Sequence, residues 1–476
     1  MKNRTMIRAL LLLILLFVGF SLSYADQNAE GNWLGTLSFS GTELRVVFKI
    51  VKSPEGKLTA TMDSPDQGAK DIPVDEVVFQ NGHLSLSLKA IAGGFEGDMK
   101  DDLTIEGQWS QGGMSLPLTL KRTDKVPEAA RPQEPKQPYP YDEKEVVYEN
   151  KKAGIELAGT LTLPKSGGPF PVVLLITGSG PEDRNETVFG HRPFLVLADY
   201  LTRRGIAVLR VDDRGVGKST GSYAKATTED FAGDVLAGVE YLKSLKEINP
   251  KQIGLLGHSE GGIIAPMVAT KSPDVSFIVL MAGTGLTGEQ ILYLQSALIE
   301  KASGTSDEVI ARDRKLKEQM FAVVKENQDS ASIDKKLRLV LNDAIAKMSD
   351  KEKQDMGYSP EMVDMTIKQM LSPWLRFFLT YDPKPALMKV KCPVLAINGE
   401  KDMQVPPKEN LPAIEEALKS GGNKDYTVKE LPGLNHLFQT ATTGSPTEYA
   451  KIEETISPAA LTIIGDWIVG HTRGKK

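Results

Sequence analysis

The sequence predicts an α/β protein in which helices cover both faces of a mostly parallel sheet, preceded by a small all-β domain. Three observations lead to this prediction. Residues 31–121 consist of short alternating apolar runs separated by turn signals, which is typical of β-structure. From residue 145 onwards, strand-like runs alternate with helical periodicity, which indicates parallel strands joined by helices. Between residues 287 and 385 this alternation stops, and helical, charge-rich sequence takes its place.

Residues 1–25 have the pattern of a signal peptide. Lys2, Arg4 and Arg8 form a positive region, and the apolar run at 9–20 is short for a membrane span. Small residues at Ser23 and Ala25 favour cleavage, so we expect a bacterial protein exported to the periplasm or the medium, with an uncleaved anchor as the alternative. Loss of three cations changes the formal net charge from −5 to −8 (−5 − 3). This mild acidity argues against nucleic acid or an anionic membrane as partner, and no further membrane span is expected.

The all-β domain is expected at residues 26–123. About eight short strands in some ninety residues predict a small barrel or sandwich. We expect it to act as a packing or homo-oligomerisation module, with ligand binding as the alternative. Residues 124–143 are rich in proline and charge, which predicts an extended, semi-rigid linker.

The α/β part is predicted in two segments, 144–286 and 386–476, with a helical cap inserted at 287–385. An insertion at this place has the position and composition of a lid over an acyl site. Cys392 lies in an apolar run and is the only cysteine, which allows no intrachain disulfide and no cysteine-rich metal site. Strands are predicted at 146–149, 155–163, 172–177, 207–211, 253–256, 277–281, 394–398 and 426–431, and helices at 228–245, 262–270, 409–419 and 458–469.

The most informative segment is 257–261, Gly-His-Ser-Glu-Gly, which joins an apolar run to helical periodicity. Glycines two positions before and after Ser259 permit the tight strand–turn–helix turn that exposes a serine Oγ as nucleophile. The helix N-terminus below it favours negative charge that develops above it. A second match at 217–221 lacks an adjacent strand and a following helix, so Ser219 is predicted to be a loop serine.

A serine nucleophile needs a base and an acid that orients the base. Of the five histidines, His436 follows the last predicted strand, whereas His258 adjoins the nucleophile and is expected to point elsewhere. The acid is expected at the end of the preceding strand, where Asp402 is preferred to the local competitor Glu400. The sequence therefore predicts the catalytic set Ser259, Asp402 and His436.

Acyl transfer also requires two preorganised N–H donors for the oxyanion. One is expected from the backbone of Glu260, the residue after the nucleophile. The other is expected from the glycine-rich loop after the strand at 172–177, where Ser179 is preferred and Gly178 is the alternative.

At these residues the chain resembles the α/β-hydrolase superfamily, and more narrowly the bacterial exported esterases of the EstD type, which have an N-terminal β-domain. The resemblance runs from about residue 145 to the C-terminus. It implies an α/β-hydrolase fold with an inserted cap, and hydrolysis of small-molecule carboxylic esters through an acyl-enzyme intermediate, with no cofactor and no metal. Its motifs are Gly178-Ser179-Gly180-Pro181-Glu182-Asp183-Arg184, Asp213-Arg214-Gly215-Val216-Gly217-Lys218-Ser219, Gly257-His258-Ser259-Glu260-Gly261-Gly262, Gly399 with Asp402, and Asn435-His436.

Other functions remain open at this point. A serine peptidase of aminopeptidase type or an acyl thioesterase would use the same three residues, although export disfavours an intracellular thioester substrate. An esterase requires least, because it needs only an apolar acyl pocket and an oxyanion hole. Outside catalysis, the chain could be a ligand-binding protein with a hydrolase scaffold, but a scaffold has no need of a complete catalytic set.

Overall fold

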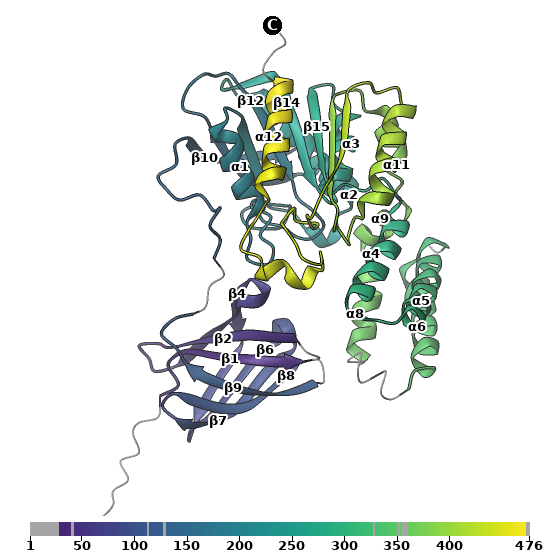
Figure 1. Ribbon diagram of the computed structural model, residues 1–476. Coiled ribbons are helices and arrows are strands. Elements are labelled where there is room, and N and C mark those ends of the chain that lie inside the picture. Colours follow the sequence, from purple (N-terminus) through teal and green to yellow (C-terminus); the bar gives the residue numbers. More distant parts are fainter. Residues whose placement is uncertain are drawn as a thin grey trace, which may run out of the picture. The chain divides into compact units, whose positions relative to one another are not determined.

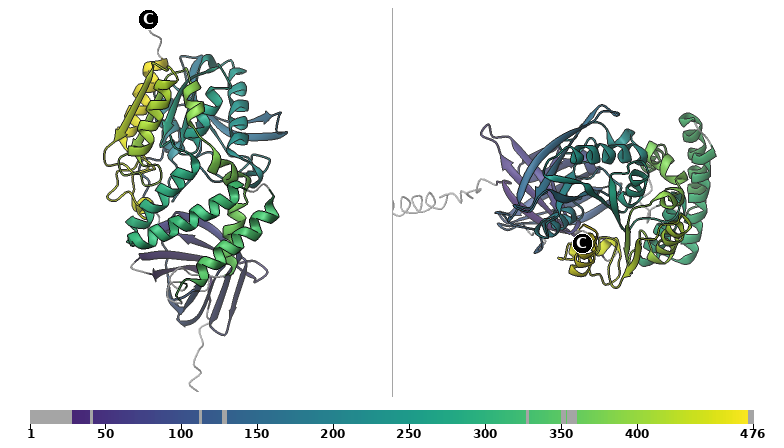
Figure 2. Two further views of the ribbon diagram at one scale, coloured as in Figure 1. Left: turned by 90° about the vertical axis from the view of Figure 1, so that its right-hand side faces the viewer. Right: turned by 90° about the horizontal axis from the view of Figure 1, so that it is seen from above.

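The computed structural model describes residues 28–39, 42–111, 114–126, 130–326, 329–349, 353 and 360–472, so the predicted signal peptide lies outside the described residues. Contacts divide the chain into two compact units, whose elements are labelled in Figure 1 and seen from two further sides in Figure 2. The first unit comprises the residues up to Asp63 and Asp71–Val126, and the second comprises Ser64–Lys70 and residues 127–476. The predicted linker at 124–143 crosses the division between the units.

The described part of the first unit is a single, nearly closed antiparallel sheet around one apolar core. Inward-facing residues alternate along the strands, as with Leu84, Leu86 and Leu88 of β6. Trp33 is fully buried at the centre. The strand order is β4-β3-β2-β1-β9-β8-β7-β6-β5. The strands are β1 Gly31–Phe39, β2 Thr42–Lys52, β3 Leu58–Ser64, β4 Ala69–Val74, β5 Glu76–Gln80, β6 His83–Leu88, β7 Gly93–Asp101, β8 Thr104–Gln111 and β9 Met114–Arg122.

Strand β4 is absent from the sequence prediction. It lies at an edge of the sheet, has no fully buried residue, and contains Pro73. An edge strand tolerates proline and needs little apolar alternation, so its sequence gives a weak strand signal.

The second unit is built on an eight-stranded mixed sheet of order β10-β11-β13-β12-β14-β15-β16-β17. The pairs β10–β11 and β11–β13 are antiparallel, and all later pairs are parallel. The expected mostly parallel sheet is therefore confirmed. Its strands are β10 Asp142–Asn150, β11 Ile155–Leu163, β12 Phe170–Ile176, β13 Ala207–Val211, β14 Ile248–His258, β15 Val275–Met281, β16 Val394–Gly399 and β17 Tyr426–Leu431.

Helices cover both faces of this sheet, as expected (Figure 1). Helices α1 Pro193–Arg203 and α12 Pro458–Thr472 pack on one face. The other face carries α2 Thr228–Lys243, α3 Gly261–Ala269, α10 Lys384–Lys389 and α11 Pro407–Ser420. Helix α1 is missing from the sequence prediction because its first six residues are all buried, and a continuous apolar run has no helical periodicity.

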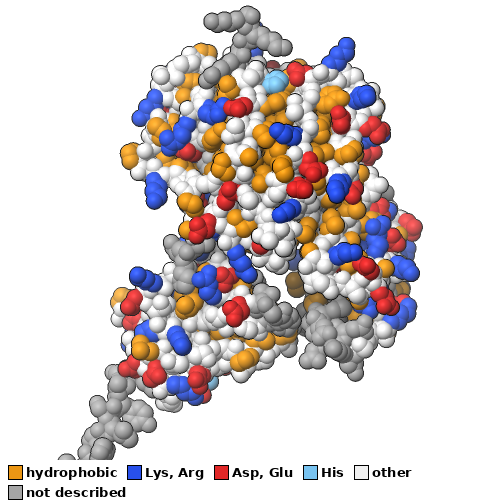
Figure 3. All heavy atoms as spheres, in the orientation of Figure 1, with side chains coloured by type: hydrophobic (Ala, Val, Ile, Leu, Met, Phe, Trp, Pro, Cys, Tyr) orange, Lys and Arg blue, Asp and Glu red, His pale blue; other side chains and the backbone are white. Residues whose placement is uncertain are grey.

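Between β15 and β16 the chain forms a helical layer with an apolar core of its own. Acidic and basic side chains are interspersed on the visible face of this layer (Figure 3). Arg338, for example, pairs with Asp334 and Asp364. Helices α4 and α9 of this layer contact each other and border the sheet unit. The described helices are α4 Gly288–Ala302, α5 Asp307–Glu326, α6 Ser330–Ala346, α8 Pro360–Met370 and α9 Pro373–Thr380.

The described part of the proline-rich segment is fastened to the second unit. Arg131 donates hydrogen bonds to the backbone carbonyls of Phe189 and Ala450 at 3.0 Å. Gln133 accepts from the backbone N–H of Thr455 at 2.6 Å. Along the described stretches of chain, no helix combines the length and apolar character needed to cross a membrane.

Candidate active site

Ser259 lies at the turn between the end of β14 and the start of α3. Its φ of 52° is in the left-handed region, which is costly for a residue with a side chain and is maintained only when the surroundings enforce it. Here the backbone N–H of Ser259 donates to the carbonyl of Met281 at the end of β15, at 2.8 Å. The turn is therefore fixed from outside, and it presents Ser259 above the N-terminus of α3.

The two glycines of the motif are required by close backbone packing. A Cβ on Gly257 would lie 1.9 Å from the carbonyl oxygen of Gly261, and a Cβ on Gly261 would lie 2.2 Å from the carbonyl oxygen of Ile176. Both contacts are with backbone atoms, which cannot move aside as a flexible side chain can. The spacing of the motif thus reflects the contact of the turn with β12 and with itself.

Ser219, in the second matching motif, is a buried loop residue with a structural role. Its Oγ donates to the carbonyl of Asp212 at 2.7 Å and accepts from the backbone N–H of Ala158 at 2.9 Å. The first bond ties the loop to the residue after β13, and the second ties it to β11. The interpretation of Ser219 as a loop serine agrees with this geometry.

His436 and Asp402 follow the ends of β17 and β16 and are hydrogen-bonded to each other. His436 Nδ1 lies 2.8 Å from Asp402 Oδ2, and both side chains are buried. The second oxygen of Asp402 accepts from the backbone N–H groups of Gln404 and Val405, both at 2.8 Å. The competitor Glu400 is exposed and accepts from the N–H of Gly433 instead.

The backbone N–H groups around Ser259 differ in whether they already have a hydrogen-bond partner. Ser179 and Glu260 have no hydrogen-bond partner for their N–H among the described residues, and both line the same cavity as Ser259. This leaves Ser179 rather than Gly178 available as an oxyanion donor. The occupied N–H groups are those of Gly178, which donates to Glu186 Oε1 at 2.8 Å, Gly180, which donates to the Tyr223 hydroxyl at 2.8 Å, and Glu182, which donates to Asp213 Oδ2 at 3.0 Å.

Two cavities meet at Ser259. The helix-side cavity, of about 450 Å³, reaches the helical layer, and about half of its lining is apolar. The His436-side cavity, of about 500 Å³, contains His436 and two carboxylates beside apolar residues. Ser179 and Gln404 line both. The other residues of the helix-side cavity are Glu260, Ile263, Thr284, Ile291, Leu292, Trp374, Gln295, Phe378 and Val405, and those of the His436-side cavity are Gly178, Glu182, Glu186, Val188, Phe189, His258, His436, Leu437 and Tyr449.

The side chain of Glu260 links the turn that carries Ser259 to the helical layer. Its Oε1 accepts from the hydroxyl of Thr228 at 2.6 Å and from Trp374 Nε1 of α9 at 2.8 Å. The indole of Trp374 stacks on Phe378, with ring centroids 5.0 Å apart. Burial raises the pKa of Glu260 to about 7, against the two hydrogen bonds. The sequence pattern pointed only to the backbone of Glu260.

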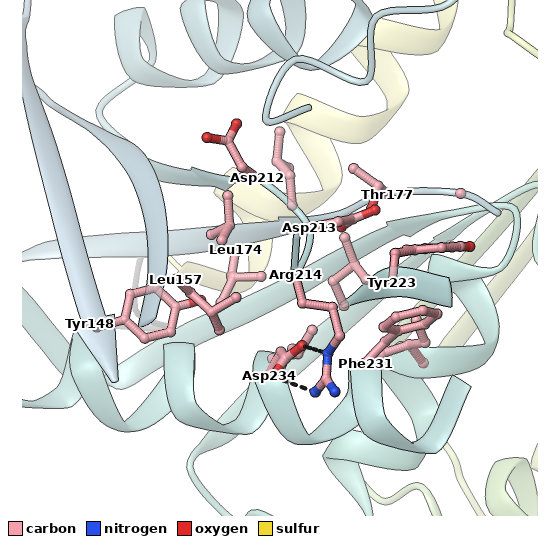
Figure 4. Close-up of a pocket in the computed structure, with 16 residues that line it drawn as sticks. Tyr148, Leu157, Leu174, Thr177, Asp212, Asp213, Arg214, Tyr223, Phe231 and Asp234 are labelled. Atoms are coloured by element: carbon pink, nitrogen blue, oxygen red, sulfur yellow. Dashed lines mark hydrogen bonds and ion pairs between the residues drawn. The ribbon is translucent and has the colours of Figure 1, made fainter. Parts of the chain in front are cut away.

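Asp213 and Arg214 brace the loops around the site (Figure 4). Asp213 Oδ1 accepts from the hydroxyl of Thr177 at 2.8 Å, and its Oδ2 holds the N–H of Glu182, so Asp213 fixes both ends of the loop that carries Ser179. Arg214 pairs with Asp234 of α2 at 2.7 Å. These residues border a third cavity of about 500 Å³, and burial raises the pKa of Asp213 to about 8.

His258 and Glu186 are site residues that sequence reasoning missed. The ring of His258 hydrogen-bonds to Glu186 and to the backbone carbonyl of His436. Glu186 lies two residues beyond the last position of the motif at 178–184, and its burial gives no sequence signal of its own.

Comparison with known proteins gives the family. The family model described as "Serine aminopeptidase, S33" matches residues 192–440. Esterase EstD of Thermotoga maritima is 27% identical over 205 residues, which is 42% of this chain and 46% of the esterase. An uncharacterized 31.7 kDa protein of Escherichia coli, from the traX-finO intergenic region, is 25% identical over 276 residues, 57% of this chain and 85% of that protein. This chain thus spans about half the length of the esterase.

Solved structures of low sequence identity also match. Est1E of Butyrivibrio proteoclasticus, in a structure with bound ferulic acid, is 16% identical with a TM-score of 0.40, over 69% of this chain and 100% of that chain. The Pyrococcus furiosus esterase Pf2001 is 15% identical with a TM-score of 0.40, over 70% and 92%. Since the family model alone spans more than half of the sequence, the chain belongs to the serine aminopeptidase S33 family of α/β-hydrolases.

Proposed function

We propose that this protein hydrolyses carboxylic esters through a covalent acyl-enzyme. Ser259 attacks the ester carbonyl while His436 takes the Oγ proton and then delivers it to the leaving alcohol. Asp402 orients His436 and stabilises the imidazolium that forms. The backbone N–H groups of Ser179 and Glu260 bind the oxyanion. Water, activated by His436, then releases the acid and restores Ser259.

The observation that carries this proposal is the placement of free N–H donors beside the serine. Within the described chain, two residues that line one cavity with Ser259 have an N–H without a partner, while the N–H groups of Gly178, Gly180 and Glu182 in the loop after β12 are occupied. Glu260 is buried, and a buried amide without a partner is costly unless it serves a ligand. Ser179 is exposed, so its N–H is open to a ligand. A developing oxyanion is the ligand that suits such a pair next to a nucleophile.

The helix-side cavity supports binding of the acyl group below the helical layer, because half of its lining residues are apolar. The apolar residues come from α3, α4 and α9 and from the turn before α11, and the polar ones are Ser179, Ser259, Glu260, Thr284, Gln295 and Gln404. The leaving alcohol would then occupy the His436-side cavity.

Hydrolysis of p-nitrophenyl esters from acetate to palmitate tests the proposal, with Ser259→Ala as the matched variant. We expect turnover by the wild-type protein, loss of turnover in the variant with the fold retained, and a chain-length optimum set by the helix-side cavity. Turnover that survives in a pure Ser259→Ala preparation would contradict the assignment of the nucleophile.

A peptidase is the second candidate, because the family is described as a serine aminopeptidase. An aminopeptidase needs a carboxylate on the acyl side to bind the substrate ammonium group. The carboxylate bordering that cavity is Glu260, which is engaged by Thr228 and Trp374. Assay of aminoacyl p-nitroanilides beside the esters distinguishes the two, and we expect the esters to be preferred.

We also propose that the protein is exported, on the basis of the sequence pattern at residues 1–25. Fractionation of expressing cells and N-terminal sequencing of the mature protein test this. We expect a mature chain that begins at Asp26, and a chain retained in the cytoplasm with residues 1–25 intact would contradict the proposal.

A further inference from the structure

The buried ring of His258 has a hydrogen-bond acceptor at each nitrogen. Nδ1 lies 2.9 Å from Glu186 Oε1, and Nε2 lies 3.0 Å from the backbone carbonyl oxygen of His436. A carbonyl oxygen has no proton to give, so Nε2 must carry one. Glu186 Oε1 in turn accepts the N–H of Gly178.

These contacts are satisfied by an imidazolium and a carboxylate. A neutral imidazole has one N–H, which leaves one of the two short contacts of His258 without a proton unless Glu186 supplies it. Burial alone would lower the pKa of His258, but the charge and hydrogen bond of Glu186, the His436 carbonyl and Asp402 together raise it to about 9. The ion pair is buried on both sides.

The pair connects the three parts of the proposed active site. Glu186 accepts the N–H of Gly178, in the loop that carries Ser179. His258 directly precedes Ser259, and its Nε2 donates to the backbone carbonyl of His436. The rings of His258 and His436 lie 4.8 Å apart. A positive charge therefore stands beside the imidazole that must accept the serine proton.

We propose that Glu186 and His258 are positioning residues that fix the loop of Ser179, the turn of Ser259 and the backbone of His436 relative to one another. This inference rests on the proposed hydrolase function. The charged and titratable groups around His258 are Glu186 and Glu182 on the loop after β12, and Asp402 and His436 after β16 and β17. Burial raises the pKa of Glu182 to about 7.

The first test measures pH profiles of kcat and KM for wild type, His258→Gln, Glu186→Gln and the double variant. Because neither Glu186 nor His258 touches the substrate carbonyl, we expect KM to change little. Loss of either residue should let the catalytic groups shift by about 1 Å, which lowers kcat by about 100-fold. The double variant should be no slower than the single ones, since all remove one shared interaction.

His83→Gln is the matched control. His83 also has two acceptors, Asp98 at 2.7 Å and Glu96 at 2.8 Å, but it is exposed in the first unit. Its replacement should leave kcat and KM unchanged. An unchanged kcat in folded His258→Gln would overturn the inference.

The second test needs no turnover and no substitution of His258 or Glu186. In wild-type protein with ¹⁵N-labelled histidine, NMR should show one buried imidazole with both nitrogens protonated at pH 8, and His83→Gln identifies the exposed one. A His258 ring that is neutral at pH 6 would refute the charged pair. The proposed function fails separately, if Ser259-dependent turnover is absent while His258 is doubly protonated.

Discussion

The Gly257→Ala substitution would place a methyl group 1.9 Å from the carbonyl oxygen of Gly261 and 2.1 Å from its carbonyl carbon. Side-chain Cβ atoms essentially never approach another heavy atom closer than 3.0 Å, so the turn must open by at least about 1 Å. The contacted atoms belong to the first turn of α3, whose position sets both Ser259 and the N–H of Glu260. The substitution therefore displaces the nucleophile relative to its oxyanion donors.

Two magnitudes follow from this displacement. Overpacking of a close contact costs about 1–3 kcal/mol of unfolding free energy. A displacement of about 1 Å between reacting groups costs about 100-fold in rate. We therefore expect Gly257→Ala to fold at 25 °C with lowered stability and to lose about two orders of magnitude in kcat/KM.

Urea unfolding and ester hydrolysis measure the two effects. Gly470→Ala is the control, because a Cβ on Gly470 in α12 would meet nothing within 4 Å and alanine is favoured in a helix by about 0.5–1 kcal/mol. That variant should keep full activity and gain a little stability. If Gly257→Ala retained kcat/KM within about threefold of wild type, the steric account of the motif would be refuted, because 1 Å of misplacement could not be so cheap.

Three further substitutions give distinct outcomes. Ser219→Ala should keep kcat/KM within about threefold and lose about 1–2 kcal/mol of unfolding free energy, because Ser219 makes two buried backbone hydrogen bonds; an inactive but folded variant would mean that the nucleophile was wrongly chosen. Asp402→Asn should lower kcat by about three to four orders of magnitude with KM little changed, since an amide can stabilise neither the imidazolium nor the required tautomer of His436; a loss below tenfold in steady-state assays would contradict this role. Glu260→Gln tests how the ionisation of Glu260 changes stability with pH. The pKa of Glu260 is raised from 4.5 to about 7 in the folded protein. Its contribution to stability is therefore fully present below pH 4.5 and is lost as pH rises through 7. The unfolding free energy of Glu260→Gln relative to wild type should therefore rise by about 3 kcal/mol from pH 4.5 to 8 in urea titrations, and a pH-independent difference would show that Glu260 ionises normally.

Local patterns in the sequence predicted much of the sheet unit. The bounds of β11, β13 and β17 agree with the predicted ranges, because each is a short run between clear breakers. Helix α1 gave no such pattern because its first six residues are all buried. Strand β4 gave none because it lies at the edge of its sheet and has little apolar alternation. In the first unit, barrel and sandwich could not be separated, because the choice depends on pairing between β1 and β9 across the whole domain.

The site residues that follow strand ends could also be predicted from local sequence patterns. Asp402 and His436 were predicted from chain order and strand ends, and the two side chains lie in hydrogen-bond contact. Glu186 with His258 and Glu260 with Trp374 were not predicted. These pairs join residues 72 and 114 positions apart, and nothing in either local sequence specifies the partner.

The central claim is that Ser259 is the nucleophile, and a fluorophosphonate probe followed by mass spectrometry of the digested protein tests it most directly. The account predicts one adduct, on the peptide that contains Ser259, with labelling strongly reduced in His436→Ala. An adduct on Ser219, or no adduct on a protein that hydrolyses esters, would contradict it.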